Sequence, residues 1–99
     1  MPSLRVDIVR FVDECQPGVV ACEFTDASGY RHTIVDKVPM FSSEPLWTDS
    51  TYPVAGEALC SVLKTWRDLS GRELAQITSI EALNGQSAFT VLASQIQED

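Results

Sequence analysis

The chain holds a single histidine, His32, and any acid–base or nucleophilic chemistry that depends on histidine must use it. Cys22 and Asp36 are the reactive groups expected nearest to it. Cys22 belongs to the facing arm of a predicted hairpin, and Asp36 follows on the same side of the same strand. These three residues are the candidate catalytic set of a small enzyme or ligand-binding barrel. No oxyanion site or nucleophile elbow accompanies them, so a hydrogen-bonded structural role for His32 is the stronger interpretation.

The cysteines give no sign of a metal or disulfide site. Cys15, Cys22 and Cys60 are odd in number and form no Cys-x-x-Cys pair, and their spacing with His32 matches no common ligand pattern. We therefore expect buried thiols and no metal. The five glycines are dispersed at predicted turns, so no phosphate-binding loop and no cofactor is predicted either.

An acidic surface is the clearest compositional feature. Fourteen acidic residues oppose seven basic ones, for a formal net charge of −7. Such a charge disfavours binding to nucleic acid or to anionic membranes and favours a basic protein partner. The connection over residues 40–53 combines acids with two large aromatic residues, and it supplies the candidate partner-binding residues Glu44, Trp47, Asp49 and Tyr52. The alternative for Trp47 is that it fills one end of the core.

A turn sequence that occurs twice marks the strands that must position these residues. Asp26-Ala27-Ser28-Gly29 and Asp68-Leu69-Ser70-Gly71 each combine an aspartate that can bond its own backbone with a glycine for the left-handed position. The first turn predicts a hairpin over residues 19–38, with Cys22 and His32 on its inward face.

Residues 57–67 are ambiguous, because their apolar positions fit both a helical stripe and one face of a strand. The second turn favours a strand as the first arm of a second hairpin, whereas a helix would make the fold α+β. Further strands are predicted over residues 4–12, 72–80 and 88–93, with a bulge near Ile8 and Val9 and a hairpin turn at Asn84-Gly85.

The fold class expected from these elements is mainly β, in one domain over residues 1–99. Strands of this number and spacing predict a small antiparallel β-barrel of about six strands with one long connecting loop. No segment approaches the ~20 apolar residues of a membrane-spanning helix, and the first residues lack a signal-peptide pattern, so a cytoplasmic location is expected.

Short runs over most of the chain resemble a group of bacterial proteins of about this length. The runs are Arg10-Phe11-Val12-Asp13, Gln16-Pro17-Gly18, Cys22-Glu23-Phe24, Ser28-Gly29, His32-Thr33, Asp36-Lys37-Val38-Pro39, Tyr52-Pro53, Gly56, Trp66-Arg67-Asp68 and Gly71-Arg72-Glu73-Leu74. This resemblance implies no activity. The order of hairpins is also loosely similar to the small barrels of translation-factor domains, which implies a fold and no role in translation.

The first functional hypothesis is a non-enzymatic protein-binding or accessory domain with an acidic surface. An immunity protein that neutralises a basic nuclease is one concrete form of it. A small-molecule-binding barrel or small enzyme using His32 and Cys22 is the alternative from another class. A third hypothesis is a barrel that binds single-stranded nucleic acid on Phe24, Tyr30 and Trp66, which the acidic charge disfavours.

Overall fold

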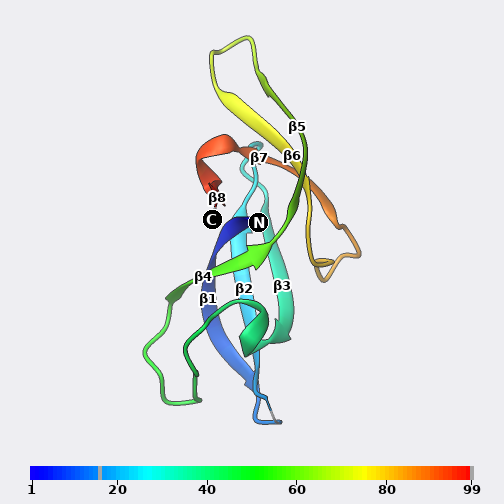
Figure 1. Cartoon of the computed structure of the whole chain (residues 1–99). Coiled ribbons are helices and arrows are strands. Elements are labelled where there is room, and N and C mark those ends of the chain that lie inside the picture. The colour runs from blue at the N-terminus through cyan, green and yellow to red at the C-terminus, as the bar shows by residue number, and fades with distance from the viewer. Residues whose placement is uncertain (16, 99) are drawn as a thin grey trace.

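The computed structural model describes residues 1–15 and 17–98 (Figure 1). Within them the chain is mainly β, as predicted. The strands are β1 (Pro2–Asp13), β2 (Val19–Thr25), β3 (Arg31–Lys37), β4 (Val54–Leu59), β5 (Ser61–Arg67), β6 (Glu73–Thr78), β7 (Ala88–Leu92) and β8 (Ile96–Glu98). Two short 3₁₀ turns, η1 (Val38–Met40) and η2 (Ala93–Gln95), accompany them. The α+β alternative is wrong, because residues 61–67 form a strand.

The strands form two antiparallel sheets. Sheet A has the order β3-β2-β1-β4, with β8 also pairing with β1, and sheet B has the order β5-β6-β7. Only Cys60 separates β4 from β5, so the chain passes almost directly from one sheet into the other (Figure 1). Among the described residues the pairings do not close into a single ring, so the predicted barrel is not confirmed.

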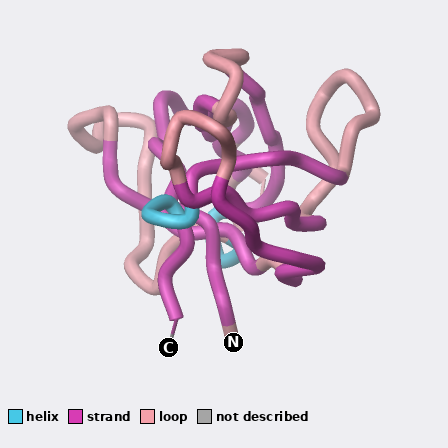
Figure 2. The backbone as a smooth tube through the Cα atoms, turned by 90° about the horizontal axis from the view of Figure 1, so that it is seen from above, coloured by secondary structure: helices cyan, strands magenta, loops and turns pink. Residues whose placement is uncertain are grey.

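Strand β1 organises sheet A and bends along its length. Its register against β2 shifts between Ile8 and Arg10 and again between Phe11 and Asp13. The first shift confirms the bulge predicted near Ile8 and Val9. The start of β1 pairs with β8 on one side and with β4 on the other, so the first and last strands of the chain lie side by side (Figure 2).

One hydrophobic cluster joins the two sheets. Alternation along the strands places the apolar side chains of both sheets on facing sides, where they lose contact with water. The largest fully buried apolar side chains are Leu4, Ile8, Val20, Ile34, Ile77 and Val91. Strand β5 differs, because each of its seven residues is exposed.

The two repeated turns have the same hydrogen-bond pattern. In each, an aspartate Oδ1 accepts the backbone N–H groups of the residues two and four positions later. The glycine, Gly29 or Gly71, has a φ of 87° or 90°, a conformation that side chains with a Cβ atom rarely adopt. The repeat therefore predicted both hairpins correctly, including the strand assignment of residues 61–67.

The connection over residues 40–53 packs differently from the expectation that Trp47 fills the core. Phe41 is buried, and Leu46 and Tyr52 pack against the core cluster, whereas Trp47 is 60% exposed. Three hydrogen bonds hold the Trp47 backbone in a local turn: its N–H donates to Ser50 Oγ, and its carbonyl accepts from the Ser50 N–H and the Tyr52 hydroxyl.

Candidate functional site

His32 lies on the inward face of the first hairpin, as the alternation predicted, and it is only 6% exposed. Its ring packs 4.8 Å from the Phe89 ring and 5.2 Å from the Phe24 ring, measured between centroids. The imidazole thus bridges sheet A and sheet B within an aromatic cluster.

The partner of His32 is Asp26, for which the sequence predicted only a role in the turn. Nε2 of His32 donates to Oδ2 of Asp26 at 2.7 Å, while Oδ1 accepts the N–H groups of Ser28 and Tyr30. Partial burial alone would raise the pKa of the Asp26 carboxyl. The hydrogen bonds from His32, Tyr30 and Ser28, together with the attraction of His32, outweigh this and hold that pKa below its usual value.

Cys22 and Asp36 do not join this pair. Cys22 lies opposite Ile34 in the register and is fully buried, and burial raises the pKa of its thiol to about 12. Asp36 lies opposite Val20, and its Oδ1 accepts the Lys37 N–H. The structure therefore does not bring the candidate catalytic set together, and Cys22 has the character of an inert core thiol.

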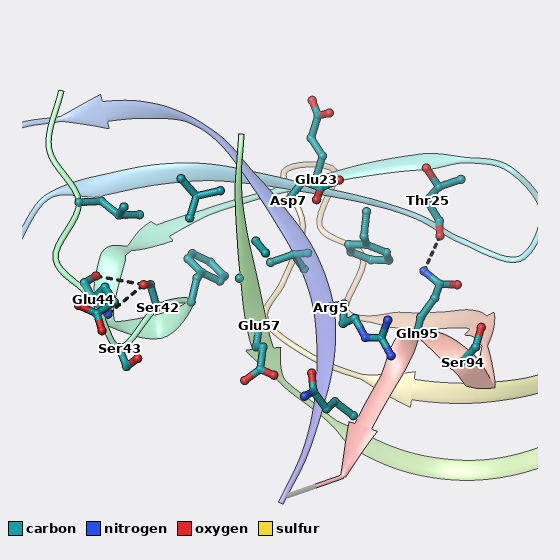
Figure 3. Close-up of a pocket in the computed structure, with 18 of the residues that line it drawn as sticks. Arg5, Asp7, Glu23, Thr25, Ser42, Ser43, Glu44, Glu57, Ser94 and Gln95 are labelled. Atoms are coloured by element: carbon teal, nitrogen blue, oxygen red, sulfur yellow. Dashed lines mark hydrogen bonds between the residues drawn. The ribbon is translucent and has the colours of Figure 1, made fainter. Parts of the chain in front are cut away.

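A wide groove lies instead over sheet A and the connection that follows β3. We call it the acidic groove; its volume is about 920 Å³ (Figure 3). Among the residues that the structure describes, its charged lining consists of the carboxylates Asp7, Glu23, Asp26, Glu44 and Glu57 and one base, Arg5. Ser42 and Glu44 lie at one end in Figure 3, and Thr25 and Gln95 lie at the other.

Strand alternation and register create this lining. In β1 the buried Leu4, Val6 and Ile8 alternate with the exposed Arg5 and Asp7. Asp7 lies opposite Glu23 of β2 and Ala55 of β4, while Arg5 lies opposite Glu57 of β4. The sheet therefore sets the Asp7 and Glu23 carboxylates directly across from each other.

Gly56 lets the connection close one side of the groove. The Glu57 N–H donates to the Phe41 carbonyl at 2.9 Å, which holds the connection against β4. A Cβ atom on Gly56 would lie 2.9 Å from that carbonyl oxygen and 2.8 Å from Ile8 Cδ1, closer than side chains pack. Glycine is thus required for the close approach of the two segments.

The carboxylates of the groove are mostly not neutralised. Arg31 lies 3.5 Å from Glu23, and Asp26 is bound to His32. The other ion pairs of the described residues join Arg67 to Glu73 and Arg72 to Asp68, so none includes Asp7, Glu44 or Glu57. Like charges directly opposite each other destabilise a sheet, and a bound cationic group would relieve this repulsion.

The predicted partner-binding residues divide between two places. Glu44 lines both the acidic groove and a smaller neighbouring groove of about 530 Å³, and Trp47 lines the smaller one. Tyr52 is half-buried, and its hydroxyl donates to the Trp47 carbonyl at 2.6 Å. Asp49 is exposed in the turn that follows Trp47 and lines neither groove.

The sequence pattern did not identify Asp7, Glu23 and Glu57 as candidate site residues. The alternation of β1 already placed Asp7 on the solvent face, but the neighbours of Asp7 depend on pairing with β2 and β4. The Asp26–His32 contact had a local signal, because both residues fall on the same face when the alternation of β2 is continued into the turn.

Within residues 1–15 and 17–98, no group of three or more His, Cys, Asp or Glu side chains is placed to hold a metal ion. The same part of the chain contains no helix with the length and apolar character needed to cross a membrane. Comparison of the chain with protein-family models, with curated proteins and with solved structures gave no match.

Proposed function

We propose that this chain is a protein-binding domain that holds a basic, extended segment of a partner protein in the acidic groove. The observation that carries the proposal is the lining of the groove, where five carboxylates accompany one arginine. Asp7, Glu44 and Glu57 lack an internal ion pair among the described residues, so their charge is available to a ligand.

The shape of the groove favours a segment of chain as its ligand. The lining comes from β1, β2, β4, the connection and the residues around η2, which gives the groove length along the sheet (Figure 3). The partly exposed Leu46, Val54 and Leu92 supply an apolar surface beside the carboxylates. Lysine and arginine side chains suit such a surface, because their stems bury against apolar groups while their charged ends meet the carboxylates.

An immunity-like role is one concrete form of this function. The net charge of −7 would steer a basic nuclease toward the chain and speed their association at low salt. The hypothesis of a small-molecule-binding barrel or small enzyme that uses His32 and Cys22 has no comparable support, because neither residue lines either groove. Phe24 is buried and cannot stack on a base, and the net charge of −7 disfavours nucleic acid, so the hypothesis of single-strand binding has less support still.

The test is a titration with a hexa-arginine peptide. We expect salt-sensitive binding to the wild-type chain that the Asp7→Asn/Glu57→Gln double variant weakens at least about fivefold, which corresponds to about 1 kcal/mol. The matched control is Glu14→Gln/Glu81→Gln, which removes the same charge at two exposed positions outside the groove. Equal weakening in both double variants would show non-specific attraction and overturn the assignment of the groove.

A further inference from the structure

Strand β5 presents an uncovered sheet edge, and we propose that it pairs antiparallel with β5 of a second copy of this chain. The proposal does not depend on the acidic groove. In Figure 1 the β5–β6 hairpin projects beyond the rest of the molecule, with β5 along its outer side.

Each of the other long edge strands is covered at one point by a backbone hydrogen bond with another part of the chain. The Thr33 carbonyl of β3 accepts the Leu83 N–H, and the Thr90 carbonyl of β7 accepts the Ala27 N–H. On β4, the Glu57 N–H donates to the Phe41 carbonyl. In the described chain, β5 receives no such bond on the side away from β6, so its outer backbone groups are left to water or to another strand.

The turn geometry identifies the outward backbone groups. The Asp68 N–H donates to the Arg72 carbonyl, which makes these two residues a hydrogen-bonded pair. Hydrogen-bonded and non-bonded pairs alternate along an antiparallel ladder, so Trp66 pairs with Leu74 through its backbone. The backbone groups of Thr65 and Arg67 consequently point away from β6, toward the position of an added strand.

Exposed apolar side chains accompany this edge. Leu63 and Leu69 are 58% and 109% exposed, and Trp66 is 37% exposed. An added strand would remove much of this surface from water, as occurs when an extended segment joins a sheet edge.

Charge favours a second copy as the occupant. Arg67 and Arg72 are paired with Glu73 and Asp68, so the β5–β6 hairpin is nearly neutral and two copies of the acidic chain repel each other less here than at their acidic surfaces. A two-fold axis beside Trp66 sets Lys64 opposite Asp68 of the second copy and pairs the two Trp66 residues. The same axis places the outward backbone groups of Thr65 opposite those of Arg67 in the second copy. An axis beside Lys64 would instead set two ammonium groups against each other.

The experiment combines light scattering after size exclusion with residue-resolved amide exchange on the wild-type chain. We expect a concentration-dependent mass approaching twice 10.9 kDa. The Thr65 and Arg67 amides should become at least about tenfold more protected at high than at low protein concentration. The Trp66 amide, which bonds to β6 in either state, serves as the internal reference.

Two variants locate the interface. Thr65→Pro removes an N–H that β6 does not use, and Trp66→Lys sets two ammonium groups at the axis. Each should give a monomer, whereas Thr33→Pro on the covered edge of β3 and Tyr30→Lys at another exposed aromatic should leave the mass unchanged. If Thr65→Pro fails to fold, the mass of Trp66→Lys and the amide exchange of the wild-type chain still test whether β5 forms the interface.

Three results would overturn the proposal. The first is a wild-type monomer at every concentration with rapidly exchanging Thr65 and Arg67 amides. The second is a dimer that Trp66→Lys leaves intact, because its interface must then lie elsewhere. The third is protection of these amides only after addition of a different protein, which would assign the edge to another partner.

Discussion

His32 and Asp26 form a partly buried side-chain pair that ties the first turn to the core, with 2.7 Å between Nε2 and Oδ2. Asp26 makes two backbone hydrogen bonds in the turn, while His32 packs against Phe24 and Phe89. In the equivalent second turn, Oδ2 of Asp68 instead accepts from the exposed Arg72 side chain. The same turn sequence thus has a structural anchor in one hairpin and a solvent-exposed ion pair in the other.

His32→Ala should destabilise the chain by about 2–4 kcal/mol, because it leaves a cavity in the aromatic cluster and deprives Asp26 of its partner. A double-mutant cycle with Asp26→Ala, measured by urea unfolding, should give a coupling of about 1–3 kcal/mol. The matched cycle is Asp68→Ala with Arg72→Ala, whose coupling should be smaller because these groups are exposed. Equal coupling in the two cycles would refute the anchoring role of the first pair.

Acid should unfold the protein partly through Asp26. The pKa of this carboxyl is lowered in the folded state from its ordinary value of 3.8. Its contribution to stability is therefore fully present above pH 3.8 and is lost as the pH falls through the lower folded-state pKa. The pKa of Asp68 is also lowered, chiefly by the hydrogen bond from the Ser70 hydroxyl, so it acts in the same direction. Urea midpoints measured between neutral pH and pH 2 should fall more steeply for wild type than for Asp26→Asn; identical slopes would contradict the assignment.

Gly56→Ala should destabilise the fold by about 1–3 kcal/mol, since the added methyl group must displace the Phe41 carbonyl or the Ile8 side chain. The displacement should also weaken the Glu57 N–H bond to Phe41, which amide exchange at residue 57 would report. Ala55→Gly, at the preceding exposed position of β4, is the control. It reports how much the free energy of unfolding changes when a residue of this strand is replaced without a steric clash. A Glu57 amide that stays as protected as in wild type would disprove the proposed close approach.

Cys15 should react with a disulfide reagent in the native protein far faster than Cys22 and Cys60. Cys15 is exposed, whereas the other two are buried, and burial raises the pKa of both their thiols. Mass spectrometry after brief labelling would identify the modified residue, and labelling in urea gives the unfolded reference. Preferential labelling of Cys22 would instead restore it as a candidate nucleophile.

The features that the sequence predicted correctly are those that depend on residues close together in the chain. Turn residues and alternation gave both repeated hairpins, the bulge in β1 and the inward face of His32, since each depends on neighbouring residues. The separation into two sheets and the position of Trp47 depend on packing between distant segments. Asp7 and Glu23 illustrate the same limit, because only the register between β1 and β2 sets them opposite each other.

The most direct test of the acidic groove as a protein-binding site is amide chemical-shift mapping of the isotope-labelled chain with a hexa-arginine peptide. We predict saturable shifts concentrated at Arg5, Asp7, Glu23 and Glu57, which line the groove from three neighbouring strands. The Asp7→Asn/Glu57→Gln variant should reduce them, while Glu14→Gln/Glu81→Gln should not. Shifts confined to other acidic positions, or spread evenly over the surface without saturation, would contradict the account.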